Sequence, residues 1–155
     1  MKLGFIGTGN ISSDVITGIC NSKISFKRIV VSPRNKQKAQ KLKKKFKRVS
    51  IAKSNQDVID KSDWVFLGVV PKVGEKILPR LNFKTNQTIV SFISTINYAQ
   101  LKKIVKKKAR IVRAIPMPPI SLGKGPVPIF PPDKKVKNFF DKIGTTIEIK
   151  SEKLS

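Results

Sequence analysis

Apolar runs and amphipathic stretches alternate along the whole chain. Short apolar runs are typical of strands buried on both faces, and longer segments with apolar residues every three or four positions are typical of helices. The expected strands are Lys2–Ile6, Ile29–Ser32, Val49–Ile51, Trp64–Val69, Thr88–Ser91, Ile111–Ala114, Val127–Phe130 and Thr146–Ile149. The expected helices are Asn10–Asn21, Asn35–Phe46, Asn55–Lys61, Lys72–Leu81, Tyr98–Lys107 and Asp133–Ile143. The alternation predicts an α/β fold, a doubly wound and mostly parallel sheet with helices on both faces.

Two kinds of position refine the expected helices. In the first helix, Ile11, Val15 and Ile19 recur at four-residue spacing and should face the sheet. Asn97 and Asp133 each precede a helix directly, where an Asn or Asp side chain caps the first backbone N–H groups.

The segment 115–132 interrupts this rhythm, because it carries seven prolines and two glycines. It should contain no helix, and we expect a rigid loop, a strand and then a turn. Residues 1–150 are expected to form one domain, followed by a short tail at 151–155.

Charge and composition exclude several classes of function. The chain has 33 basic and 9 acidic residues among 155, a formal net charge of +24, which favours anionic ligands and weak, non-specific association with nucleic acid. The chain has no histidine, so a zinc site is not expected. It has a single cysteine, which excludes an internal disulfide and predicts a location in the reducing cytoplasm. No signal peptide and no apolar run of membrane-spanning length is present, so no membrane partner is expected.

A glycine-rich turn follows the first expected strand and opens the first helix. Gly7 and Gly9 are followed by Ser12 at the third position of a G-x-G-x-x-G pattern, where a small residue still allows close packing of helix and strand. Backbone N–H groups and the positive end of a helix then face a pyrophosphate. The residues expected to contact a dinucleotide here are Ile6, Gly7, Thr8, Gly9, Asn10 and Ile11.

The end of the second expected strand indicates which dinucleotide. An acidic residue there would hold the ribose hydroxyls of NAD, but the sequence has Ser32 and Arg34 instead. Both side chains can bind a 2′-phosphate, and Arg34 can also be simply one more exposed base in a basic chain. We therefore expect NADP(H) to be preferred over NAD(H).

The fourth expected strand ends in a Gly-x-x-Pro sequence at the edge where ligands bind in this fold class. The residues expected to face the cofactor there are Gly68, Val69, Val70 and Pro71. Pro71 also suits the first position of a helix, which is an equally good explanation of the motif.

Asn55 is interpreted chiefly as a helix cap, and also as a contact on the adenosine side. No candidate general acid or base emerges, so the catalytic residues stay unknown. A nicotinamide enzyme can function with few acidic side chains, because the cofactor itself carries the hydride.

Several segments of this sequence, in order, resemble the N-terminal domain of pyrroline-5-carboxylate reductases, including residues 90–93 (VSFI), the glycine loop 123–125 and Ile143–Gly144. Residues 4–11 (GFIGTGNI) are similar to the family's GFIGAGNM, and residues 62–71 (SDWVFLGVVP) to its ADVVxLAVKP. Residues 113–119 (RAIPMPP) are similar to its RxMPNTP, and Glu152 to the glutamate before its second domain. The resemblance implies a Rossmann-type domain that binds NADPH, with Asn55 and residues 68–71 along the cofactor. It also implies a cytoplasmic, oligomeric enzyme that transfers hydride to the C=N carbon of 1-pyrroline-5-carboxylate, giving proline.

Three departures keep other functions open. Val70 replaces the family's lysine, and Met117 and Pro118 replace its asparagine and threonine, all near the nicotinamide. The family's all-helical second domain, which binds the substrate carboxylate, lies beyond the resemblance. The alternatives are an oxidoreductase similar to the coenzyme-F420-dependent NADP oxidoreductases, and a non-catalytic NADP-binding module that needs a helical partner chain. A small imine substrate and a homo-oligomer are expected only if the chain is active.

Overall fold

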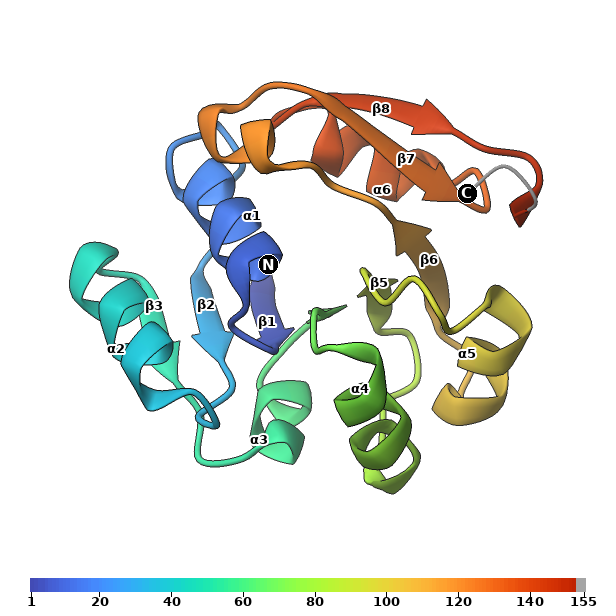
Figure 1. Cartoon of the computed structure of the whole chain (residues 1–155), viewed down its shortest axis with the longest axis horizontal. Coiled ribbons are helices and arrows are strands. Elements are labelled where there is room, and N and C mark those ends of the chain that lie inside the picture. The colour runs from blue at the N-terminus through green and yellow to red at the C-terminus, as the bar shows by residue number, and fades with distance from the viewer. Residues whose placement is uncertain (153–155) are drawn as a thin grey trace.

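The computed structural model describes residues 1–152, and it contains one eight-stranded sheet (Figure 1). The strands are β1 (Lys2–Ile6), β2 (Arg28–Val31), β3 (Val49–Ile51), β4 (Trp64–Leu67), β5 (Thr88–Ser91), β6 (Arg110–Ala114), β7 (Pro126–Phe130) and β8 (Thr145–Glu148). Their spatial order is β3-β2-β1-β4-β5-β6-β7-β8. All neighbours are parallel except β7, which is antiparallel to β6. The predicted doubly wound, mostly parallel sheet is confirmed.

Helices cover both faces of this sheet. They are α1 (Asn10–Cys20), α2 (Lys36–Lys45), α3 (Asn55–Asp60), α4 (Pro71–Ile77), α5 (Tyr98–Val105) and α6 (Lys134–Phe140). One buried core joins α1, α2 and α6 to the sheet through residues such as Val15, Leu42 and Phe140. A second core joins α3, α5 and the segment after α4 to the opposite face.

The buried face of α1 and the caps of α5 and α6 largely match the predictions from the sequence. Val15 and Ile19 are fully buried, as predicted, whereas Ile11 at the start of α1 is only half-buried. Asn97 caps α5 and accepts a hydrogen bond from the Gln100 N–H, and Asp133 caps α6 in the same way. Both predicted caps are confirmed.

Prolines change two of the predicted elements. The segment 115–132 contains a short 3₁₀ helix, η2 (Pro118–Leu122), where no helix was expected. Two prolines begin it, at positions whose N–H groups need no helical partner, so they favour the helix start instead of blocking it. Conversely, the helix expected to continue to Leu81 ends as α4 at Ile77 and tightens into η1 (Leu78–Arg80), because Pro79 has no N–H to donate.

Two further boundaries moved. β4 ends at Leu67, so Val69 lies in the following turn and not in the strand. Asn55 was interpreted as the cap of α3, but Ser54 is the cap, with its hydroxyl accepting a hydrogen bond from the Asp57 N–H at 3.1 Å. Within residues 1–152, no helix is long and apolar enough to cross a membrane.

The order of the strands decides where a ligand can bind. From β1 the chain winds outward to β2 and β3, and then crosses back to add β4 on the other side of β1. The connections that follow β1 and β4 therefore leave the sheet on opposite faces and open a crevice at the carboxyl ends of these two strands. The glycine turn and the Gly-x-x-Pro motif both lie at this position.

Candidate functional site

Gly7 connects β1 to the start of α1 and must be glycine for two reasons. Its φ of 101° lies in a region that residues with a side chain rarely adopt. A Cβ added there would also lie 2.6 Å from the backbone carbonyl of Gly68 at the end of β4. The tight turn is therefore required by the close approach of β1 and β4.

Ser32 ties the end of β2 to this turn. Its hydroxyl oxygen accepts a hydrogen bond from the Gly7 N–H at 2.8 Å, and only 3% of the residue is exposed. The Ser32 N–H in turn donates to the Phe5 carbonyl at 3.0 Å. Ser32 thus has a structural role, while its O–H remains a donor that can point into the crevice.

Gly9 differs from Gly7, because nothing in the protein requires it to be glycine. It caps α1 with φ −66° and ψ −177°, an extended conformation that any residue adopts. The nearest protein atom to a Cβ placed there is the Gly68 carbonyl oxygen, 4.0 Å away. The start of α1 has no side-chain cap and no acidic residue in its first turn. Free N–H groups therefore face open space at the positive end of an 11-residue helix.

Ser12 and Gly68 bring α1 close to the end of β4. A Cβ on Gly68 would lie 2.1 Å from the Ser12 hydroxyl oxygen, and Ser12 is completely buried. A small residue at the third position of the glycine pattern is therefore needed for packing, as the sequence predicted. The Ser12 hydroxyl has no hydrogen-bond partner among the described residues.

A crevice of about 470 Å³ lies between these elements. Nine of the thirteen predicted cofactor residues line it, namely Gly7, Thr8, Gly9, Ser32, Arg34, Asn55, Gly68, Val69 and Val70. The other four lie beside it: Ile6 is buried beneath the turn, and Asn10, Ile11 and Pro71 belong to the first turns of α1 and α4. Four lining residues were not predicted: Asn35, Lys36, Val73 and Ile77. Val73 and Ile77 are four residues apart on α4, a spacing that would have placed them on one face.

The charge of the crevice is concentrated at the β2–α2 end. Arg34 and Lys36 are exposed and line this end, and Asn35 between them caps α2. Lys38, one turn further, is half-buried and its ammonium donates to the Asn10 side-chain oxygen at 3.4 Å. No carboxylate lines the crevice, so this end is suited to an anionic group.

Four apolar side chains also line the crevice, those of Val69, Val70, Val73 and Ile77. Val70, the N-cap of α4, is 64% exposed. Met117, which follows β6, is 43% exposed but does not line the crevice. On β6, Arg113 forms an ion pair with Glu152 and donates to the Ser94 carbonyl at 2.7 Å. Glu152, which was expected only from the family resemblance, thus anchors the end of the described chain to β6.

No aspartate, glutamate or cysteine lines the crevice among the described residues. Asp57 accepts a hydrogen bond from the Lys53 N–H, which lowers the pKa of its carboxyl, and Asp63 accepts one from the Lys2 N–H. Cys20 is half-buried against the core, and burial raises the pKa of its thiol to about 11, which disfavours the reactive thiolate. Among residues 1–152 there is no group of three metal-ligating side chains.

With this geometry established, comparisons with known proteins identify the family. The family model described as NADP oxidoreductase, coenzyme F420-dependent, matches residues 2–98. The chain belongs to this family. The match covers β1 to the start of α5, and so includes the glycine turn and the whole crevice.

Individual relatives agree with the resemblance found in the sequence. A pyrroline-5-carboxylate reductase 3 of Danio rerio is 30% identical over 128 residues, which are 81% of this chain and 44% of the relative. A 1-pyrroline-5-carboxylate reductase structure from Streptococcus pyogenes has a TM-score of 0.81 and 28% identity, covering 99% of this chain and 59% of that one. A Plasmodium falciparum pyrroline carboxylate reductase, solved with NADP bound, has a TM-score of 0.79 and 23% identity, covering 99% and 58%. The chain spans about half the length of the curated relatives it matches.

Proposed function

We propose that residues 1–150 form the NADP(H)-binding domain of an oxidoreductase similar to pyrroline-5-carboxylate reductase. The observation that carries the proposal is Gly9. The protein itself leaves room for a side chain at this position, 4.0 Å from the nearest atom. A glycine in open space at a helix start without a side-chain cap is explained by a ligand that must approach the backbone closely.

Each end of the crevice would hold a different part of the cofactor. The turn at Gly7–Gly9 and the first N–H groups of α1 would bind the pyrophosphate. Arg34, with the Ser32 O–H, would bind the 2′-phosphate through charge-assisted hydrogen bonds, which favours NADP(H) over NAD(H). Asn55 would contact the adenosine side. The Plasmodium falciparum structure, solved with NADP bound, supports a nucleotide cofactor for a domain of this fold.

The apolar part of the crevice would hold the nicotinamide beside residues 68–71. NADPH supplies the hydride for reduction of a C=N bond, and in pyrroline-5-carboxylate reduction the product is proline. The part that we assign to this chain is binding and orientation, since no general acid lines the crevice. The substrate would be a small imine, and its cover would come from a homo-oligomer or a helical partner chain. The single cysteine supports a cytoplasmic location.

The decisive experiment is a titration of the purified chain with NADPH and with NADH, followed by the fluorescence of the reduced nicotinamide. NADPH should bind more tightly, and Arg34→Glu should abolish the preference. Equal affinity for both nucleotides would contradict the assignment of Arg34, and binding of neither would contradict the proposed function.

A second candidate is an oxidoreductase that exchanges hydride between NADP and coenzyme F420. It is favoured by the name of the matching family and by Met117 and Pro118, which depart from the reductase pattern. Parallel assays with a cyclic imine acid and with a reduced deazaflavin separate the two activities. Activity with neither donor nor acceptor, but with NADPH bound, would leave a non-catalytic NADP-binding module.

A further inference from the structure

The lysines of α2 form an uncompensated cationic surface. Between Asp14 and Asp57 the sequence has thirteen lysines and arginines and no acidic residue. Six of these cations lie within α2, at positions 36, 38, 41, 43, 44 and 45. None of the ion pairs found among residues 1–152 involves them. We call these six residues the α2 lysine face.

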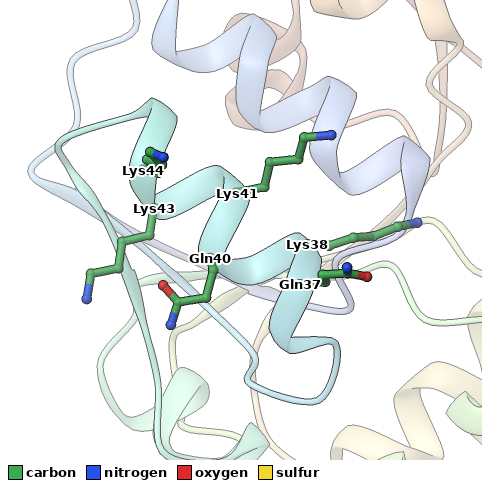
Figure 2. Close-up of a pocket in the computed structure, with 6 residues that line it drawn as sticks. All are labelled: Gln37, Lys38, Gln40, Lys41, Lys43 and Lys44. Atoms are coloured by element: carbon green, nitrogen blue, oxygen red, sulfur yellow. The ribbon is translucent and has the colours of Figure 1, made fainter.

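Packing forces these lysines outward. Ala39 and Leu42 are the buried residues of α2 and face the sheet, so the charged positions have only solvent-facing directions left. An open hollow of about 800 Å³ lies along the helix, lined only by lysine and glutamine side chains. Figure 2 shows Lys38 and Lys41 extending from one side of α2, and Gln40 and Lys43 from the other.

This surface is continuous with the candidate cofactor site. Lys36 lines the crevice itself, and Lys38 contacts Asn10 in the first turn of α1. Lys43 and Lys44 lie seven and eight residues after Lys36, which places them about 11–12 Å further along the helix axis at 1.5 Å per residue. They are therefore too far to contact a nucleotide in the crevice, yet close enough to act on it through the electrostatic field at low salt, where the screening length is about 30 Å at 0.01 M.

We propose that the α2 lysine face guides the anionic dinucleotide into the crevice and raises its association rate, and that Lys43 and Lys44, which do not line the crevice, do so without contacting the bound dinucleotide. This inference rests on the proposed cofactor function. The field of several unpaired cations beside a site attracts a ligand that carries several phosphate charges, and mobile ions weaken the attraction. The face has no exposed apolar or aromatic side chain on α2, so it lacks the groups that insert into membranes or stack on nucleic-acid bases.

The chain offers a matched control for this proposal. Lys43 and Lys44 lie in the last turn of α2, and Lys102 and Lys103 lie in the last turn of α5. Replacing either pair by glutamine removes two charges from an equivalent helix position, and glutamine is about as good a helix former as lysine. Figure 1 shows α2 and α5 at opposite ends of the molecule, and only α2 contributes a residue, Lys36, to the lining of the crevice.

The experiment is stopped-flow binding of NADPH at several ionic strengths. At about 0.01 M we expect the α2 double variant to associate roughly threefold more slowly than the parent, and the α5 variant to stay within about 1.5-fold. The difference should disappear near 0.5 M, and the dissociation rate should be the same in all three proteins. Equal association rates at low salt, or equal slowing by both pairs, would overturn the guide. Absence of NADPH binding by the parent would instead overturn the proposed function, and the guide with it.

Discussion

The two glycines of the turn should respond to alanine in opposite ways. Gly7 is required by the fold, whereas Gly9 has an ordinary backbone conformation and room for a Cβ. We therefore expect Gly7→Ala to lose stability, and Gly9→Ala to keep most of its stability and lose nucleotide affinity. A difference of this kind separates a structural glycine from a ligand-binding one within three residues.

The magnitude for Gly7→Ala has two parts. The positive φ costs about 1–2 kcal/mol for a residue with a Cβ. The Cβ would also lie 2.6 Å from the Gly68 carbonyl, a backbone atom that can move only if β4 moves, and overpacking of this kind costs about 1–3 kcal/mol. The total of about 2–5 kcal/mol corresponds to a fall in melting temperature of roughly 5–15 °C for a domain of this size.

The magnitude for Gly9→Ala is smaller for stability and larger for binding. Alanine is a poorer N-cap than glycine, which costs about 0.5–1 kcal/mol, or roughly 1–4 °C. In the bound state its methyl group would occupy the space in front of the first N–H groups of α1, and moving a phosphate away from one charge-assisted hydrogen bond costs about 1.5–3 kcal/mol, or roughly ten- to a hundredfold in Kd.

Thermal unfolding and NADPH titration of the two variants measure both quantities. Serine at position 9 is a useful third variant, because it restores a good N-cap while still adding a side chain. If Gly9→Ala and Gly9→Ser bind NADPH as tightly as the parent, close approach of the ligand to this backbone is refuted. If Gly7→Ala is as stable as the parent, the account of the β1–β4 contact is refuted.

Three further outcomes follow from individual side chains. Arg34→Gln should weaken NADPH about ten- to a hundredfold and NADH less than about twofold, which nucleotide titrations measure. Asn97→Ala removes a capping box and should lower the free energy of unfolding by about 1 kcal/mol, measured by urea denaturation. Burial raises the pKa of the Cys20 thiol from 9.0 to about 11, so the fold favours the protonated form. The stability from this group is therefore complete below pH 9 and declines as the pH rises toward 11, and comparison of urea unfolding at pH 8 and about 10.5 in the parent and in Cys20→Ala isolates it.

The sequence predicted the fold well because its patterns are local. Most strands of the sheet are short runs rich in apolar residues, and all eight are present at nearly the predicted residues. The errors occur where a local rule has two possible outcomes. Proline excludes a helix interior but favours a helix start, which explains the missed η2, and two polar residues, Ser54 and Asn55, competed for one cap.

The candidate site was predictable to the extent that it is built from strand ends. Gly7, Ser32 and Gly68 each end or follow a strand, and parallel strands bring such ends together. The roles inside the site were less predictable, because they depend on distances between segments far apart in the sequence. The Gly7 N–H to Ser32 contact spans 25 residues, and the Lys38 to Asn10 contact spans 28. Nothing in the local sequence distinguishes Lys38 from the lysines beside it.

Binding and catalysis should separate in this chain, and the two ends of the crevice explain why. The end at Arg34 has charged and hydrogen-bonding groups supplied by the chain itself. Val70, which lines the crevice at the start of α4, is 64% exposed, and an acceptor held beside it would be open to water. Hydride transfer requires an acceptor that is fixed against the nicotinamide and shielded. We therefore expect this chain to bind NADPH and to reduce a cyclic imine acid only when a covering surface is supplied in trans, for example by the helical half of a reductase relative. Efficient reduction by the chain alone, as a monomer in sedimentation analysis, would show that β4 and β6 provide the whole reactive site.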